Sequence, residues 1–252
     1  MPQFLVEPAD VDPRAGRARI RGDEARHLAR VLRLAPGARV ALCDGRGGRW
    51  EGRLVAVGPP AEVAGLKPLS SNEPPVEVEI LQALIKGERW EWSLEKATEL
   101  GVTRFRPVYA RRSVARIPGP KVAARTGRWR RIVAAAVKQC ERGRVPRVDP
   151  PLDLAGAIEA LGPPGAGEAR IVWAERLPGA PVADDPAVPR RVILAVGPEG
   201  GWDPGDRALL GAAGFVPRPL GPRVLRAETA AVAGVVWAMA RWGDLEQGAP
   251  GW

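Results

Sequence analysis

Two glycine-rich segments near the C-terminus restrict the fold of this chain more than any other feature. Residues 197–201 (GPEGG) and 220–230 (LGPRVLRAETA) each follow a short apolar run, and each precedes a helical pattern. If the two apolar runs, 192–196 and 215–220, are parallel strands of one sheet, their carboxyl ends place both loops on the same edge. Open α/β sheets bind ligands at that edge, so we predict a ligand site built from these two loops.

The segments before and between these loops indicate a parallel sheet. From residue 76 on, short apolar runs alternate with longer segments of helical periodicity, which is typical of strands joined by helical crossovers. Asp203 followed by Pro204 predicts a helix that starts where the first loop ends, because Asp caps helices and Pro suits their first position. We expect strands at 76–84, 103–109, 144–148, 169–173, 192–196 and 215–220, and helices at 89–100, 121–140, 152–161, 204–213 and 227–242.

The last of these helices is apolar nearly all round. Its residues Val232, Val235, Val236, Trp237 and Met239 leave it no polar face, which indicates burial in a large core or against another subunit. A helix of this length is too short to span a membrane. We therefore expect a homodimer interface here, followed by a disordered tail at 247–252.

Residues 1–72 read as a separate small β-rich module. Asp23, after a short strand at 17–21, is a candidate cap for a helix in which Leu28, Val31 and Leu32 share one apolar face. Asp-Gly between two alternating runs, 39–43 and 49–57, is a strong hairpin signal. Such a module suggests a small barrel, and a barrel of this size usually binds a partner instead of catalysing. A Pro- and Ser-containing linker at 68–75 separates it from a second domain, which we place at 73–246.

The basic residues are concentrated in the middle of the chain. Residues 104–147 hold 14 Lys and Arg against one acid, whereas residues 151–252 hold 9 against 12, within a net charge of +9. An arginine-rich genome would raise the basic count everywhere, but it would not remove acids from one segment alone. A polyanion is the natural partner of such a segment.

Several functional classes are made improbable by what the sequence lacks. It has no export signal and no apolar window of membrane-spanning length, so we expect a cytoplasmic protein with no membrane partner. The cysteines, Cys43 and Cys140, are far apart, and the single histidine, His27, is near neither. This spacing predicts no metal site and no disulfide framework, only two thiols in a reducing cytosol.

The chemistry of the loops narrows the ligand. Neither loop has the lysine and hydroxyl of a Walker sequence or the glycine spacing of a dinucleotide fingerprint, which argues against nucleoside triphosphates and NAD. Glycines allow backbone groups to approach an adenine edge or a ribose closely, and Glu199 suits a cationic group better than a phosphate. The alternative is a tight turn with a solvated Glu199.

Arg226 is unusual because it begins a helix, where the macrodipole disfavours positive charge. An RNA phosphate or a neighbouring carboxylate would compensate it, although a surface arginine folded onto Glu228 or Asp244 is also possible. Glu228 lies in the first turn, where a carboxylate stabilises a helix without any further role.

The two loops together resemble the signature of the bacterial small-subunit (16S) ribosomal RNA uracil-N3 methyltransferases of the SPOUT superfamily. Residues 27–34, 86–87, 96–102, 112–113 and 139–146 agree with that family in order and spacing. The resemblance covers residues 20–244, and the second loop is its most specific part.

The resemblance implies a PUA-like RNA-binding barrel followed by an α/β domain with a parallel sheet and a deep trefoil knot. It also implies an obligate homodimer, S-adenosyl-L-methionine (SAM) as methyl donor, and a uridine in the decoding region of the small ribosomal subunit as acceptor. The implied cofactor-binding residues are Trp173, Ala174, Glu175, Val196, Gly197, Glu199, Gly200, Gly201, Leu220, Gly221, Val224, Leu225 and Arg226.

Uracil N3 must lose a proton before it accepts a methyl group, so a carboxylate must remove that proton or a cation must stabilise the resulting anion. We hypothesise that Arg226 stabilises the anion or its phosphate, with Glu228 or Glu199 orienting it or acting as base. Two alternatives stay open: methylation of another RNA site, and a non-catalytic ribosome-assembly factor. Candidate RNA-binding residues are His27, Arg30, Arg33, Arg111, Arg112, Arg128, Arg130, Arg131 and Arg142.

Overall fold

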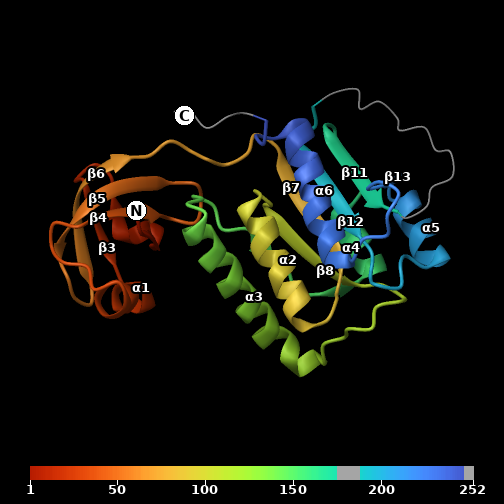
Figure 1. The fold of residues 1–252 in the computed structure, drawn as a ribbon, viewed down its shortest axis with the longest axis horizontal. Coiled ribbons are helices and arrows are strands. Elements are labelled where there is room, and N and C mark those ends of the chain that lie inside the picture. Colours follow the sequence, from red (N-terminus) through yellow and green to blue (C-terminus); the bar gives the residue numbers. More distant parts are fainter. Residues whose placement is uncertain (175–187, 247–252) are drawn as a thin grey trace. The chain divides into compact units, whose positions relative to one another are not determined.

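The computed structural model describes residues 1–174 and 188–246, which form two compact units (Figure 1). The first contains residues 1–73 together with 134–145, and the second contains residues 74–133 and the chain from Pro146 on. The predictions for Glu175 and for a disordered tail at 247–252 fall outside the described residues. None of the described helices combines the length and the apolar character needed to cross a membrane.

The first unit contains a six-stranded sheet in the order β1-β4-β5-β6-β3-β2. The predicted hairpin is confirmed: β4 and β5 pair antiparallel, and the Asp44 carboxylate accepts hydrogen bonds from the backbone N–H groups of Arg46 and Gly48 in the turn. Sequence reasoning missed the last strand, which pairs with both β5 and β3. The strands are β1 (Gln3–Leu5), β2 (Val11–Asp12), β3 (Arg17–Ile20), β4 (Arg39–Cys43), β5 (Arg49–Ala56) and β6 (Ala61–Pro68).

The helix expected after Asp23 differs from the prediction. A short helix α1 (Gly22–Arg26) continues into a π-helical turn over His27–Val31, and the Asp23 side chain does not cap it. The wider turn rotates the following residues away from the face that carries Leu28. Leu28 is therefore fully buried, whereas Val31 is 65% exposed and Leu32 39%. Of the three residues predicted to share one apolar face of a helix, only Leu28 is buried.

Residues 134–145, which sequence analysis assigned to the second domain, pack with the first unit. The Gln3 side-chain amide donates to the Val137 and Arg142 carbonyls, and the Glu73 carboxylate accepts from the Arg142 guanidinium and from the backbone N–H of Gly143. Cys43 is buried in this unit, and burial raises its pKa to about 12, so it stays protonated at neutral pH.

The second unit is built on a parallel sheet, as predicted. Its order is β10-β8-β7-β12-β11-β13 with β9 beside β8, and every pairing is parallel. Strands β12 and β13 both flank β11, so the loops that follow them lie on one edge, as the sequence led us to expect. The strands are β7 (Glu77–Ala83), β8 (Arg104–Tyr109), β9 (Arg147–Val148), β10 (Leu152–Asp153), β11 (Glu168–Trp173), β12 (Arg191–Val196) and β13 (Val216–Arg218).

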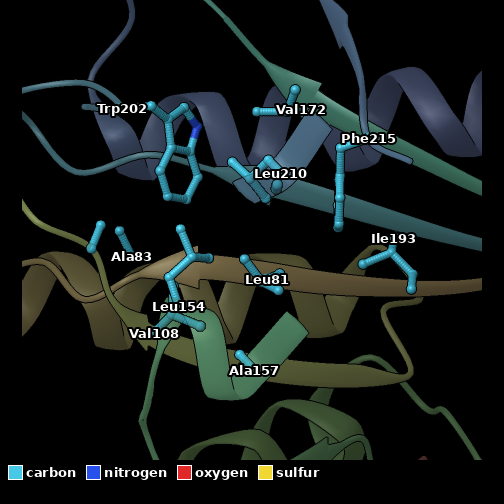
Figure 2. Packing of buried hydrophobic residues seen from close by; sticks show 12 residues of the cluster. Leu81, Ala83, Val108, Leu154, Ala157, Val172, Ile193, Trp202, Leu210 and Phe215 are labelled. Atoms are coloured by element: carbon cyan, nitrogen blue, oxygen red, sulfur yellow. The ribbon is translucent and has the colours of Figure 1, made fainter. Parts of the chain in front are cut away.

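Helices cover both faces of this sheet (Figure 1). Helices α2 and α6 lie over one face, and α4 and α5 lie over the other, where Leu154, Leu210 and Trp202 pack against Leu81 and neighbouring strand residues (Figure 2). The predicted cap at Asp203 is confirmed, since its carboxylate accepts a hydrogen bond from Gly205 N at 2.9 Å. The helices are α2 (Gly87–Glu99), α3 (Gly119–Gln139), α4 (Leu154–Leu161), α5 (Pro204–Ala212) and α6 (Ala227–Trp242).

Helix α6 is only partly covered by its own chain. Ala231, Val235 and Ala238 are fully buried, but Val236 is exposed. The prediction of a homodimer interface on this helix therefore stays a prediction, as does the passage of the chain through itself that the resemblance implies.

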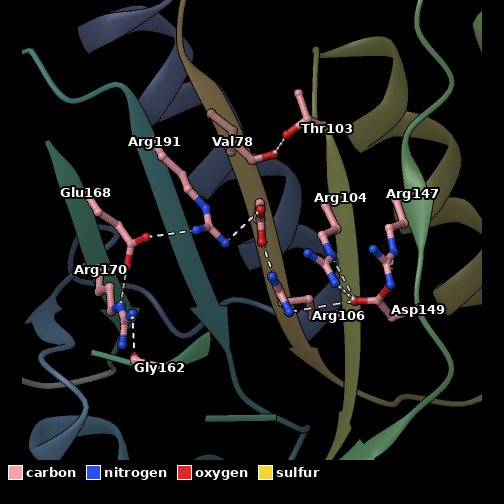
Figure 3. A network of polar contacts seen from close by, with 11 residues as sticks. Val78, Thr103, Arg104, Arg106, Arg147, Asp149, Gly162, Glu168, Arg170 and Arg191 are labelled. Carbon is pink, nitrogen blue, oxygen red and sulfur yellow. Dashed lines mark hydrogen bonds and ion pairs between the residues drawn. The ribbon is translucent and has the colours of Figure 1, made fainter. Parts of the chain in front are cut away.

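A row of paired charges, buried at its centre and exposed at Arg147, crosses the amino-terminal part of the same sheet (Figure 3). Arg106 donates to Glu79 at 2.6 Å, and Glu79 also pairs with Arg191. Burial lowers the pKa of Arg191, but its hydrogen bond to Glu79 and the nearby carboxylates more than compensate, so the pKa is raised. Further pairs join Glu168 to Arg170 and Arg191, and Asp149 to Arg104, Arg106 and Arg147.

Candidate active site

A cavity of about 660 Å³ opens at the carboxyl ends of β11, β12 and β13. It is lined by the last residue of β11, the last residue of β12 and the two glycine-rich loops. Of the expected cofactor-binding residues it brings together Trp173, Ala174, Val196, Gly197, Glu199, Gly200, Gly201, Leu220, Gly221, Val224, Leu225 and Arg226. Pro198, Arg223, Ala227 and Ala230, which also line it, lie within the two loops predicted as the ligand site. Sequence reasoning missed Trp202 and Arg207, and it had assigned Arg112 to RNA only.

The glycines give the loops their shape. Gly201 and Gly221 have φ values of +68° and +84°, a left-handed conformation that other residues rarely adopt. A Cβ on Gly197 would lie 3.2 Å from the indole nitrogen of Trp202, which packs beneath the loop. Arg112 holds the same loop from outside by donating to the Gly200 carbonyl at 3.1 Å. The first loop is therefore a tightly supported backbone cradle.

Trp173 forms one wall of the cavity and depends on Gly234 in α6. A Cβ on Gly234 would overlap the Trp173 indole, so only glycine lets the helix and the ring pack this closely. The outer edge of the ring meets Trp237 in a T-shaped contact at 5.4 Å. This explains a glycine in the middle of a helix that is otherwise rich in alanine and valine.

The charges around the cavity are mostly positive. Among the residues that the structure describes, its charged lining consists of one carboxylate, that of Glu199, and of the side chains of Arg112, Arg207, Arg223 and Arg226. Within residues 1–174 and 188–246, the side chains of Arg207, Arg223 and Arg226 show no hydrogen bond or ion pair. Such a cavity suits a ligand that carries at least one anionic group and one cationic group.

Arg226 and Glu228 do not act on one another as a pair. Arg226 is the residue that precedes α6, and its side chain is exposed at the cavity. Glu228 is buried and does not line the cavity; its Oε1 atom lies 3.7 Å from the Nε atom of Arg89. Its Oε2 atom has no hydrogen-bond partner among the described residues. The carboxylate is thus turned toward the start of α2.

A second cavity of about 560 Å³ lies beside the first and shares Glu199 with it. Its other lining residues are Lys86, Gly87, Glu88 and Arg89 at the start of α2, together with Val114. The signal for this site was present in the sequence, because Lys86 and Gly87 follow an apolar run as the two loops do. Gln82 lines neither cavity, but it is buried in β7 in register with Val196, and its amide has no partner among the described residues. Buried unpaired groups are costly, so they concentrate where function requires them.

The candidate RNA-binding residues differ in how they are presented. His27, Arg30 and Arg33 are exposed in the first unit, and Arg131 is exposed on α3. Arg111 and Arg128 are exposed but pair with Asp206 and Glu91, and Arg130 donates to the Val148 carbonyl. Arg142 is different: its side chain is 3% exposed and bound by Glu73, so it is not presented to a phosphate.

Two family models match the two parts of the chain. An RNA methyltransferase domain matches residues 72–239, and an RNA methyltransferase PUA domain matches residues 20–63. The fold and the cavity at the strand ends therefore define an RNA methyltransferase of the SPOUT type with a PUA domain. No group of three or more His, Cys, Asp or Glu side chains that could hold a metal ion lies within the described ranges 1–174 and 188–246.

Comparison with individual proteins identifies the family within this class of RNA methyltransferases. Ribosomal RNA small subunit methyltransferase E from Mycobacterium bovis is 38% identical over 219 residues, covering 83% of this chain and 81% of the relative. The protein of that name from Synechocystis is 36% identical, covering 81% of this chain and 66% of the relative. The chain belongs to the ribosomal RNA small subunit methyltransferase E family.

Solved structures agree with this membership. The family member from Neisseria gonorrhoeae, bound to S-adenosyl methionine, has a TM-score of 0.85 and 30% identity, covering 97% of this chain and 99% of that chain. A methyltransferase from Legionella pneumophila in complex with the same cofactor has a TM-score of 0.82 and 27% identity, covering 97% of this chain and 98% of that chain.

Proposed function

We propose that this protein transfers a methyl group from SAM to N3 of one uridine in the decoding region of 16S rRNA, within the small ribosomal subunit. The observation that carries the proposal is the glycine-lined cavity at the carboxyl ends of β11, β12 and β13. The relatives from Neisseria gonorrhoeae and Legionella pneumophila, whose chains this one matches almost end to end, bind SAM.

The residues around the cavity suit SAM. A volume of about 660 Å³ lies within the range of small-molecule sites, roughly 300–1,000 Å³. SAM combines a flat adenine, a sulfonium cation and a carboxylate. The glycine backbone and Trp173 suit the adenine, Glu199 suits the sulfonium cation, and the unpaired arginines suit the carboxylate. We assign the cofactor site to the residues predicted for it from sequence, with Glu175 outside the described residues.

SAM supplies an electrophilic methyl group when it is bound, and the chain's residues have to position and activate the acceptor. Most of the rate then comes from holding the nucleophile close and in line. Arg226 stands at the mouth of the cavity and stabilises the deprotonated uracil or its phosphate, and Glu199 or Glu228 orients the base or takes the N3 proton. These roles for Arg226, Glu199 and Glu228 are proposals.

The RNA footprint is proposed to lie on the exposed basic residues. N3 is on the pairing edge of uracil, so a paired target has to be turned out of its helix, at a cost of about a few kcal/mol. Phosphate contacts supply the energy for this and set the register. The candidates presented for this role are His27, Arg30, Arg33, Arg111, Arg112, Arg128, Arg130 and Arg131. The buried Arg142 is not among them.

We also propose that the active form is a homodimer through the second unit. Val236 is the large apolar residue of α6 that its own chain leaves exposed, at 40%, among the described residues. Val236→Asp would then convert a dimer into a monomer in sedimentation experiments. A wild-type chain that sediments as a monomer would contradict this proposal.

The test of the function has two parts. Titration calorimetry with SAM measures donor binding, and its absence would favour a non-catalytic assembly factor. Mass analysis of nucleosides in small-subunit RNA, from a strain with and without the gene, identifies the methylated atom. Loss of N3-methyluridine from 16S rRNA is expected; loss of a different modified nucleoside would favour the alternative of another RNA site.

A further inference from the structure

The second cavity has only one residue in common with the proposed cofactor site, Glu199, and the rest of its lining has no role in that site. It shares Glu199 with the first cavity, and its remaining charged residues are Lys86, Glu88 and Arg89. All of these residues belong to the second unit. A group that lies in this cavity against Glu199 is next to the proposed donor cavity without occupying it.

The charged side chains that line this cavity are two cations, Lys86 and Arg89, and two carboxylates, Glu88 and Glu199. These types of group can be compared with the pairing edge of a nucleobase. Uracil presents an acceptor, a donor and an acceptor in sequence, namely O4, N3–H and O2. Its complement is a donor, an acceptor and a donor. Lysine and arginine are donors without acceptor capacity, and an ionised glutamate is an acceptor only. Lys86, Glu199 and Arg89 supply these three elements.

We propose that the second cavity receives the target uracil, with Glu199 facing N3–H while Lys86 and Arg89 face the two carbonyl oxygens. This assignment rests on the proposed function and selects among its alternatives, because it makes Glu199 the base. Cytosine presents a donor, an acceptor and a second acceptor along the same edge. Its N3 has no proton for Glu199 to accept, and its amino group faces a cation.

The same arrangement suits the reaction. The N3 proton passes to the Glu199 carboxylate, the N3 lone pair forms the new bond to the methyl carbon, and the electrons of the carbon–sulfur bond remain on sulfur. Negative charge spreads onto O2 and O4 as the proton leaves, and two cations beside those atoms stabilise it. The amino-terminal end of α2 adds a positive partial charge at the same place.

Glu228 then acts through Arg89. Its Oε1 atom lies 3.7 Å from the Arg89 Nε atom, so the pair orients a guanidinium that would otherwise be free to rotate at the surface. We therefore assign Glu228 as a positioning residue, and Glu88 to the first helical turn, where a carboxylate is favourable.

The experiment measures N3 methylation of small subunits that lack the methyl group, with SAM as donor. Lys86→Met and Arg89→Met are expected to lower kcat/KM by about a hundredfold each, with SAM affinity within about twofold of wild type. The loss in kcat/KM relative to wild type should become smaller as pH rises, because a uracil that is already ionised depends less on a cation to stabilise its anion. Arg89→Lys keeps the charge and should retain most of the rate.

Arg190→Met is the matched control. Arg190 is an exposed arginine immediately before β12, at the end of that strand opposite to the cavities. The inference is overturned if Lys86→Met and Arg89→Met behave like Arg190→Met, if their losses are equal at every pH, or if they lose SAM affinity in parallel with rate. A wild-type protein that binds SAM but makes no N3-methyluridine would instead refute the proposed acceptor, before any variant is tested.

Discussion

The two ends of the parallel sheet use the same residue type in opposite ways. At the amino-terminal end of the strands, Arg104, Arg106, Arg147, Arg170 and Arg191 each pair with a carboxylate (Figure 3). At the carboxyl end, the side chains of Arg207, Arg223 and Arg226 line a cavity and show no such partner among the described residues. At the amino-terminal end the arginines are neutralised within the fold, and at the carboxyl end they are available to a ligand. We call these the closed end and the open end.

This difference shows that arginine content alone does not locate function. The paired arginines are neutralised by carboxylates of the same fold, and neighbouring arginines share these carboxylates. A buried charge without such a partner would be very costly. The arginines at the loops keep their charge available for something outside the chain. The partner of each arginine is therefore more informative than its position in a basic stretch, and mutations at the two ends should fail in different ways.

The largest effect is expected from breaking a pair at the closed end. Arg106 and Glu79 are each only 8% exposed, and removing one partner of a buried pair typically costs about 3–5 kcal/mol. Arg106→Met should therefore lower the free energy of unfolding by that amount in urea titrations. SAM affinity, extrapolated to the folded fraction, should not change.

The double variant Arg106→Met with Glu79→Leu is the control for this prediction. In Arg106→Met the buried Glu79 carboxylate loses one of its two arginine partners and keeps only Arg191. Replacing Glu79 as well removes this under-compensated carboxylate, so part of the lost stability should return. If the double variant were as unstable as the single one, the pair would contribute by something other than charge compensation.

Replacing an arginine at the carboxyl end of the strands should slow the reaction and leave the free energy of unfolding almost unchanged. Arg226→Ala is expected to slow methyl transfer about 10²–10³-fold, the usual loss when one stabilising group is removed from a developing charge. Because the side chain is exposed, stability should stay within about 0.5 kcal/mol of wild type. Near wild-type turnover would remove Arg226 from the mechanism.

Added salt should weaken RNA binding by the exposed arginines much more than it changes the stability supplied by the buried pairs. With about five phosphate contacts, affinity for small subunits should fall by nearly three orders of magnitude, roughly 500-fold, between about 50 and 200 mM salt. The buried pairs are screened much less, so the free energy of unfolding should hardly change. A flat salt dependence of binding would contradict the proposed RNA footprint.

A smaller effect is expected from the wall of the donor cavity. Gly234→Ala should destabilise the protein by about 1–3 kcal/mol through overpacking, although Ala normally favours helices. It should also weaken SAM binding, because the added methyl group displaces Trp173. Gly211→Ala in α5 is the matched control: a Cβ there meets nothing within 4 Å, and stability should rise by about 0.4–1 kcal/mol. Equal effects of the two changes would refute this account of Trp173.

Sequence patterns predicted the alternating strands and helices of the second unit because apolar periodicity reports directly on burial. They placed both glycine loops on one edge because parallel strands leave little choice. They missed the second cavity: Lys86 and Gly87 follow an apolar run as the two loops do, but only the pairing of β7 with β12 shows that they lie near Glu199. They also placed Arg142 among the RNA contacts, because a run of basic residues does not reveal that Glu73, far away in the chain, binds one of them.

The first unit is not one continuous stretch of the chain. Its compact body consists of residues 1–73 and the short stretch 134–145, which Gln3 and Glu73 bind through backbone and guanidinium groups. A gene fragment that ends at residue 73 would encode this body without one of its own pieces. A fragment of residues 1–73 should therefore be less stable than the same fragment supplied with the 134–145 segment, because it lacks the partners of Gln3 and Glu73.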